Sequence, residues 1–264
     1  MTRYSLRRSW ATFLVAAALL ACTAPASHAQ PIPVIWDHYW VYDVLNTAPV
    51  PAPPVTLVDQ FGSDFHAVIR PVHFSNPAVK YHAGFTYPIS NPDLHYLWWE
   101  IEPKPFHRPG VVVDNQFGPQ LLDVFDPRYL LNPARKNQPG PPPPGNHYKC
   151  YRCLGQPVQV DVGLQDQFGQ RTAFVAQPEL LCNPAVKVTP DGHQDPILDP
   201  EQHLVCYRLE PPMPYTYFPY VTDQFVQNFE LHLGQDRWLC VPSRKHDPTP
   251  ATPSTWGRLK SLYR

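Results

Sequence analysis

The sequence predicts an all-β protein made of four tandem units of about 42 residues, packed as β-sandwich-like domains. Proline accounts for 36 of the 264 residues and recurs too often for a helical bundle or coiled coil, because it disrupts helix interiors. Hydrophobic residues make up 43% of the chain and aromatic residues 13%, enough to build a core. The third observation is an internal repeat, for which a four-bladed β-propeller is the alternative arrangement.

Residues 1–29 have the pattern of a signal peptide. Three arginines, at positions 3, 7 and 8, precede the apolar stretch Trp10 to Ala21, and small residues at Ser27 and Ala29 mark a cleavage site. The apolar stretch is shorter than the roughly 20 residues that a transmembrane helix needs. No second apolar run follows, so we predict no transmembrane helix.

A second signal in the same segment concerns membrane attachment. Leu19 to Cys22 resembles a lipobox, in which Cys22 would carry a lipid anchor. The cleavage site downstream favours free export. We therefore predict a secreted or periplasmic protein, with a membrane-anchored lipoprotein through Cys22 as the alternative.

The charge balance bears on the kind of partner. Without the three arginines of the signal, the chain keeps 18 basic and 22 acidic residues. A mildly acidic chain lacks the basic patch that nucleic acid requires. We expect no nucleic-acid partner and an extracellular or cell-surface ligand instead.

Three sequence elements recur in the same order four times. A histidine-led segment is followed after 20 to 22 residues by a Gln-Phe pair, and a segment ending in lysine closes the unit. The histidines are His38, His95, His147 and His203; the glutamines are Gln60, Gln116, Gln167 and Gln224; the lysines are Lys80, Lys136, Lys187 and Lys245. Units 1 to 4 therefore span residues 38–80, 95–136, 147–187 and 203–245.

Each unit has the pattern of short strands. The histidine-led segment alternates and is rich in Tyr, Trp and Val, as in a half-buried strand. A proline-rich bend follows, then a second strand that leads into the Gln-Phe pair, and a third strand after the turn. One unit is too small to bury a core alone, so the units are expected to pack on one another.

The repeat also predicts the disulfides. Two positions are either both cysteine or neither: the fourth residue of the histidine-led segment and the residue before the Asn-Pro or Val-Pro pair. This predicts the bridges Cys150–Cys182 and Cys206–Cys240, consistent with an oxidising compartment. Cys153 remains unpaired, either buried and inert or an intermolecular partner.

Prolines between units 2 and 3 suggest a domain boundary. Residues 137–146 contain four consecutive prolines, typical of a stiff linker. We place a β domain with units 1 and 2 at residues 30–136, and one with the bridged units 3 and 4 at residues 147–245. Residues 246–264, rich in Pro and Thr, are predicted to be a disordered tail.

The pattern H-L-x-C-Y, D-Q-F-G, L-C-x-P-x-x-K resembles an exported bacterial repeat family, domain of unknown function 7450. Unit 4 carries it as His203 to Tyr207, Asp223 to Phe225 and Leu239 to Lys245, and unit 3 also matches well. Units 1 and 2 match the skeleton without the cysteine pair. The resemblance covers nearly all of the chain after the signal. It implies a secreted, disulfide-bearing bacterial module and supplies no activity or active-site residue.

The repeated polar residues are assigned to the scaffold. A catalytic group is usually unique, so histidines that recur in every copy are expected to bond a nearby backbone carbonyl. The Asp or Asn before each glutamine is expected to hold the following turn rather than a calcium ion or sugar. The repeated lysines are expected on the solvated surface.

Unrepeated features yield no catalytic, cofactor or metal site. His66, His73, His82 and His107 add imidazoles around unit 1 without zinc-type spacing. Cys150 and Cys153 form a C-x-x-C outside any redox context. No phosphate loop, dinucleotide fingerprint or nucleophile elbow occurs, so we predict no cofactor. The aromatic residues Trp36, Trp40, Trp98 and Trp99 are assigned to the core rather than to a binding platform.

These observations favour an exported non-enzymatic repeat protein, a structural or adhesive binding module. The alternative is an extracellular hydrolase with a site between units, and a third hypothesis is a metal-binding surface protein. An enzyme would need unrepeated polar residues that converge in one pocket.

Overall fold

The computed structural model describes residues 36–246, and every regular element in this range is a β-strand. The all-β prediction is confirmed. The predicted signal peptide, the lipobox Cys22 and the tail beyond His246 lie outside the described residues. Residues 36–246 contain no helix long and apolar enough to cross a membrane.

Each unit is one long β-hairpin. Its first arm begins with the histidine strand: β1 (His38–Val44), β6 (His95–Ile101), β9 (His147–Leu154) or β13 (His203–Glu210). Its second arm is a longer return strand: β4 (Val68–His82), β8 (Gly118–Lys136), β11 (Gly169–Val188) or β17 (Leu233–His246). The register is the same in all four, because His38, His95, His147 and His203 face Ala78, Ala134, Ala185 and Ser243. The expected third strand and closing segment are thus one continuous strand in units 2 and 3.

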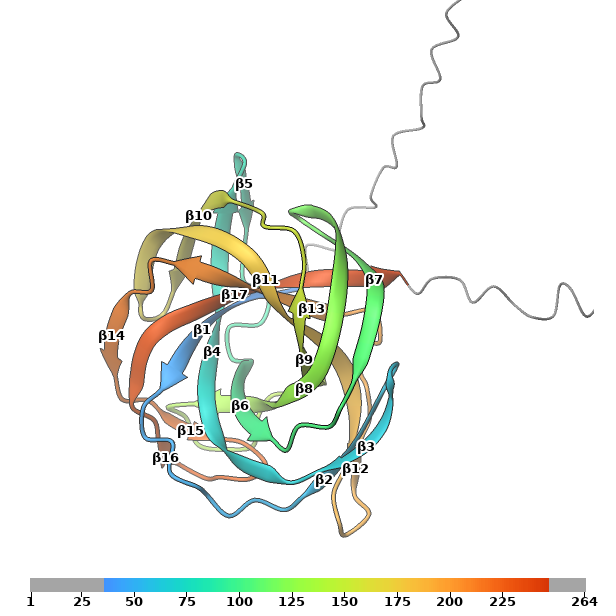
Figure 1. Cartoon of the computed structure of the whole chain (residues 1–264). Helices are drawn as coiled ribbons and strands as arrows, with labels where there is room; N and C mark the ends of the chain where they lie inside the picture. The colour runs from blue at the N-terminus through green and yellow to red at the C-terminus, as the bar shows by residue number, and fades with distance from the viewer. Residues whose placement is uncertain (1–35, 247–264) are drawn as a thin grey trace, which may run out of the picture.

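These eight strands pair into a closed ring (Figure 1). The order is β1, β4, β6, β8, β9, β11, β13 and β17, and β17 pairs again with β1. The units meet edge to edge in one connected antiparallel sheet, which differs from stacked sandwich sheets and separate propeller blades. The predicted linker 137–146 joins β8 to β9, which pair directly.

The far half of each hairpin extends beyond its ring strands. It contains the strands β2 (Val55–Asp59) and β3 (Gly62–His66), β7 (His107–Asn115), β10 (Val160–Asp166), and β14 (Pro214–Tyr217), β15 (Tyr220–Thr222) and β16 (Phe229–Glu230). Short strands β5 (Phe85–Tyr87) and β12 (Gln194–Asp195) complete the set. Each far half reaches the unit opposite: β2 pairs with β11 and β10 with β4, while β7 pairs with β17 and β15 with β8.

The turn chemistry explains the hairpin tips. In unit 2, Asn115 faces Gly118 across the turn, and Gly118 has φ of 92°, a conformation that a Cβ disfavours. Units 1 and 3 also have a glycine there, whereas unit 4 has Val226. Unit 4 correspondingly has a wider loop at its tip, between Thr222 and Phe229, and the strands β15 and β16 beside it are only 3 and 2 residues long.

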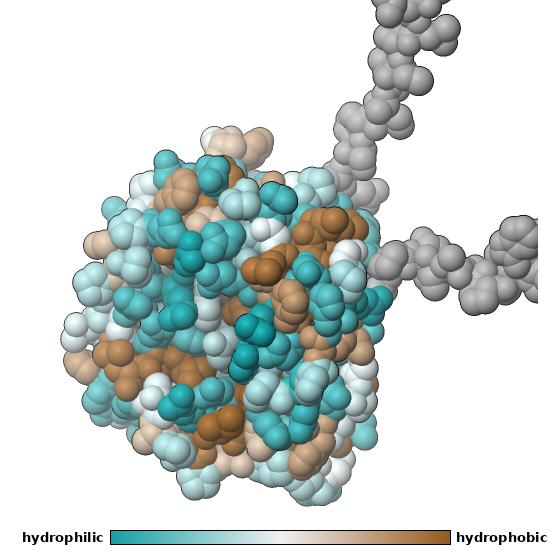
Figure 2. Space-filling model, in the orientation of Figure 1, coloured by the Kyte–Doolittle hydropathy of each residue, from teal (hydrophilic) through white to brown (hydrophobic). Residues whose placement is uncertain are grey.

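Alternation along the ring strands separates two cores. One hydrophobic cluster contains both cysteine pairs with Trp98 and Trp238, and the other contains the intervening residues such as Trp40 and Trp99. All four tryptophans assigned to the core are buried, including Trp36. On the surface, hydrophobic residues form small groups separated by polar ones on the face that Figure 2 shows.

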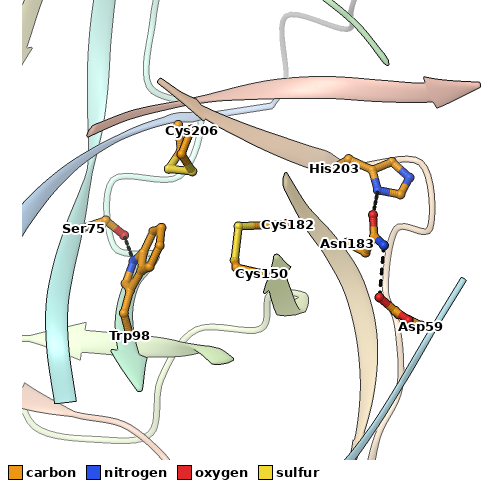
Figure 3. The surroundings of a disulfide bond; sticks show 9 residues. Asp59, Ser75, Trp98, Cys150, Cys182, Asn183, His203 and Cys206 are labelled. Carbon is orange, nitrogen blue, oxygen red and sulfur yellow. Dashed lines mark hydrogen bonds between the residues drawn. A yellow bond between two sulfur atoms is a disulfide. The ribbon is translucent and has the colours of Figure 1, made fainter. Parts of the chain in front are cut away.

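The two predicted cysteine pairs are bonded in the structure. Cys150 joins Cys182 and Cys206 joins Cys240, each directly across a hairpin with Cα atoms 3.9 Å apart. Trp98 lies near both bridges, and its indole N–H donates to Ser75 Oγ at 3.1 Å (Figure 3). Ser75 and Trp98 occupy cysteine positions of units 1 and 2, so this hydrogen bond joins two units, whereas each disulfide lies within one.

Candidate functional site

The repeated polar residues gather at one end of the ring. Each histidine begins a ring strand and each lysine ends, or nearly ends, the antiparallel return strand beside it. We call this the lysine end, defined by Lys80, Lys136, Lys187 and Lys245 with the four repeated histidines.

The prediction that these lysines are solvated is wrong. Lys80 and Lys187 are fully buried, and Lys136 and Lys245 are only 7% and 9% exposed to solvent. Each ammonium lies over the phenylalanine of the next unit's Gln-Phe pair: Lys80 on Phe117 (4.5 Å), Lys136 on Phe168 (4.4 Å), Lys187 on Phe225 (5.2 Å) and Lys245 on Phe61 (4.3 Å). The aromatic faces compensate part of the lost hydration.

Burial also shifts the titration of these lysines. It lowers the pKa of Lys80 to about 7 and that of Lys136 to about 8. Burial likewise lowers the pKa of Lys187 to about 8, although the nearby Asp195 carboxylate acts in the opposite direction.

The repeated histidines are buried beside these lysines. Burial, with the charge of the lysine in the same unit, lowers the pKa of His95, His147 and His203 to about 3 and that of His38 well below its usual value. At three of these histidines a side-chain amide oxygen lies beside the ring: Gln116 Oε1 is 2.7 Å from His38 Nε2, and Asn132 Oδ1 and Asn183 Oδ1 are 3.1 Å from Nδ1 of His147 and His203. The expected backbone bond is found at His147, with Leu131. Neutral and enclosed, these imidazoles are poorly placed to exchange protons with a ligand.

The Asp or Asn at each tip holds its turn, as predicted. Asp59 and Asn115 accept from the backbone N–H of Phe61 and Phe117 at 2.9 Å, and Asp166 and Asp223 accept from those of Phe168 and Phe225 at 2.7 Å. The three carboxylates, Asp59, Asp166 and Asp223, also accept hydrogen bonds from the opposite unit. Asp59, for example, accepts from Tyr151 and from Asn183, so a chain of contacts runs from His203 through Asn183 to Asp59 (Figure 3).

The four repeated glutamines do not share one environment. Gln116 contacts His38, and Gln224 donates to Asp195 at 2.9 Å. Gln60 and Gln167 are exposed at their tips. The glutamine position is therefore not a uniform scaffold contact.

Asp195, in the segment that follows unit 3, is an unrepeated carboxylate that contacts a repeated His-Lys pair at the lysine end. Asp195 Oδ2 lies 3.4 Å from Lys187 Nζ and 3.6 Å from His147 Nε2. A cavity of about 360 Å³ beside it is lined by His147, Asp195, Gln224 and the consecutive prolines 141–144. The proton-accepting groups here already form an ion-pair network.

The opposite end of the ring has no such repetition. The sixth residue of the histidine strand is Asp43, Glu100, Arg152 or Arg208, and the residue three places before the cysteine position of the return strand is Val72, Arg128, Glu179 or Arg237. Equivalent positions thus carry opposite charges in different units. We call this the charged mouth, defined by these eight positions.

A cavity of about 550 Å³ opens at the charged mouth, within the size range of small-molecule sites. Trp238 and Tyr129 form an aromatic wall, and Cys153 also lines the cavity. The Trp238 indole N–H donates to Glu179 at 2.8 Å, and Arg237 lies over the indole ring at 4.9 Å. Cys153 is unpaired and buried, and burial raises the pKa of its thiol.

The additional histidines lie in separate places. His66 contacts the backbone oxygen of Glu102, His73 contacts Asp43, and His107 contacts Asp123. Within residues 36–246, no three His, Cys, Asp or Glu side chains are grouped so that they could hold a metal ion.

Sequence reasoning missed the charged mouth. The available signal was the difference between units at equivalent positions, whereas the repeat search selects only what is shared.

A family model described as a repeat of unknown function, DUF7450, matches residues 10–122 and 95–242. No curated protein and no solved structure matches the chain. The comparisons thus assign a repeat and no activity.

Proposed function

Because the chain belongs to the DUF7450 repeat family, whose description names no activity, we propose that it is an exported, non-enzymatic binding module whose ligand site is the charged mouth. The contrast between the two ends of the ring supports this proposal. The lysine end repeats the same His and Lys in all four units, as a scaffold requires.

The charged mouth departs from this symmetry at equivalent positions. Some of these differences form ion pairs between neighbouring units, such as Asp43 with Arg237 and Glu179 with Arg208, but partly exposed pairs of this kind add little stability. An asymmetric cavity, in contrast, can present different groups to different parts of one ligand. The arginine side chains that line it are also partly exposed, unlike the buried repeated histidines.

Export is the second part of the proposal. Two disulfides are typical of proteins that reside in an oxidising compartment such as the periplasm or the cell exterior. The signal-like segment at residues 1–29 supplies the route, and detection of the processed chain in the periplasmic or culture fraction tests it.

Ligand screening tests the binding site. The full chain, with its disulfides formed, is screened by thermal shift against sugars, amino acids, organic acids and short peptides. We expect stabilisation by a subset that is lost in the mouth variant Tyr129→Leu and kept in the tip variant Gln167→Ala. Stabilisation that persists in Tyr129→Leu, or its absence across the panel, would contradict a site at the mouth.

The hydrolase alternative has its best location at Asp195. This carboxylate and His147 line one cavity next to Gln224. Against it, the pKa of His147 is lowered to about 3 by burial and by Lys187, which leaves the imidazole neutral. Turnover of chromogenic esters or glycosides by the wild-type protein, lost in Asp195→Asn, would favour the hydrolase instead.

A further inference from the structure

The cavity at the charged mouth is lined by more positively than negatively charged side chains. Three guanidinium groups line the cavity, from Arg128, Arg152 and Arg237, against the two carboxylates of Glu100 and Glu179. The guanidinium side chains are 37%, 52% and 44% exposed, so their remaining N–H groups are open to a ligand.

The two carboxylates that line the cavity already have partners. Glu100 accepts from Arg70 at 2.8 Å, and Glu179 accepts from Trp238 at 2.8 Å and lies 3.4 Å from Arg208. Neither Arg70 nor Arg208 lines the cavity. Glu100 is thus neutralised from outside the cavity, whereas Glu179 is bonded mainly to the Trp238 indole, because Arg208 lies closer to Glu210, at 2.6 Å.

The lining guanidinium groups have fewer partners than they can bind. Arg128 and Arg152 share Asp126, each through one N–H, at 2.9 and 2.7 Å. Each guanidinium has five N–H donors. In the described part of the chain, the buried Nε of Arg128 has no acceptor.

The remaining guanidinium is also weakly paired. Arg237 reaches Asp43 only at 3.4 Å, and Asp43 already bonds His73 at 3.0 Å. Burial alone would raise the pKa of Asp43, but the His73 contact and the charge of Arg237 lower it below its usual value. The same balance holds at Asp126, where Arg152 and Arg128 outweigh burial. The guanidinium groups therefore stabilise the ionised form of these two neighbouring carboxylates.

One wall of the cavity is apolar and accepts a flat group. Tyr129 is half-buried, and Leu154, which is 63% exposed, also lines the cavity. Trp98 and His73 support Trp238 from behind at 5.7 and 4.7 Å between ring centroids, so the wall is rigid.

Building on the proposed binding function, we propose that the charged mouth binds a small ligand that carries a carboxylate on a six-membered ring. The ring packs against Tyr129 and Leu154, and the carboxylate accepts from Arg128 and Arg152. A guanidinium fork matches the planar geometry of a carboxylate. An aromatic acid and a sugar acid both carry a carboxylate on a six-membered ring.

Matched probes test the inference on the full chain. Benzoate and glucuronate are compared with the uncharged benzyl alcohol and glucose by calorimetry and by the indole N–H resonance of Trp238. We expect the acids to bind and shift this resonance, the more so at low ionic strength. Benzoate and glucuronate separate the aromatic source from the sugar source.

Arginine variants test where the carboxylate of the ligand binds. Arg152→Gln removes an exposed guanidinium without disturbing the core, and we expect it to weaken acid binding about tenfold or more. Arg135→Gln, at the lysine end, is the matched control and should bind like the wild type. Equal binding of neutral and acidic probes at the mouth overturns the carboxylate inference but leaves the binding function. Acid binding unaffected by both Arg152→Gln and Tyr129→Leu overturns both proposals.

Discussion

The ammonium of Lys245, in the last unit, lies 4.3 Å from the ring centroid of Phe61, in the first unit. Three equivalent contacts join each earlier lysine to the next unit, so this pair completes the cycle that the strand pairing of β1 and β17 also closes. The first and last units are thus joined by the same lysine–phenylalanine contact that joins consecutive units.

The first prediction concerns this closing pair. Phe61→Leu keeps an apolar side chain but removes the aromatic face under Lys245, and we expect it to lower the free energy of unfolding by about 1–2 kcal/mol. Phe65, which is 59% exposed, is the control, and Phe65→Leu should change it by less than about 0.5 kcal/mol. Urea unfolding measures both, and equal effects would show that the cation–π contact contributes nothing.

The second prediction is a loss of stability in acid. The pKa of His203 is about 3 in the folded protein and about 6.5 when the chain is unfolded, so the unfolded state binds more protons between these values. Stability from this group is complete above about pH 6.5 and falls as the pH decreases toward about 3. His203→Gln should reduce the slope of unfolding free energy against pH by up to about 1.4 kcal/mol per pH unit. A slope unaffected by His203→Gln would contradict the assignment.

The third prediction is that Lys80 makes the stability of the protein depend on pH in the alkaline range. Its pKa is about 7 in the folded protein, against roughly 10.5 in the unfolded chain, so the unfolded state binds more protons from about pH 7 to 10.5. This group therefore makes stability rise with pH across that window. The effect of Lys80→Met on the free energy of unfolding should therefore be more favourable at pH 7 than at pH 10. Denaturant unfolding at both pH values measures this difference. Identical effects at the two pH values would refute it.

The fourth prediction concerns the bridge in unit 4. Replacing Cys206 by Val and Cys240 by Ser reproduces the residues that unit 1 has at the same positions, Val41 and Ser75. We expect a loss of about 3 kcal/mol in the free energy of unfolding, because a loop of 34 residues is no longer closed in the unfolded chain. The unpaired Cys153 supplies the control: Cys153→Ala should leave both bridges intact in non-reducing peptide maps.

The fifth prediction tests the contact between opposite units. Trp99 donates to the buried Asp223 at 2.8 Å, across the ring from unit 2 to unit 4. A double-mutant cycle of Trp99→Phe and Asp223→Asn should give a coupling energy of about 1–2 kcal/mol. Additive effects would mean that the tip of unit 4 is held by its turn alone.

Local chemistry was predictable where it depends on neighbours along the chain. The tip turns follow from Asp or Asn, Gln, Phe and Gly in order, because a short side chain can bond the backbone two residues on. The cysteine pairs could be inferred because four copies of a hairpin place the same two positions face to face. The lysines were misassigned, since the Phe that covers Lys80 comes from another unit, at Phe117.

The sequence by itself determined the β class, the unit boundaries, the cysteine pairing and the residues at each turn, all of which follow from repeated local patterns. Only the tertiary structure decided that the hairpins close into a ring, that each tip reaches the opposite unit, and that Arg128, Arg152 and Arg237 share one cavity. Ring closure depends on strand edges and side chains far apart in the sequence. Such contacts produce no regular spacing along the sequence, so the charged mouth could be recognised only from the pairing of the strands.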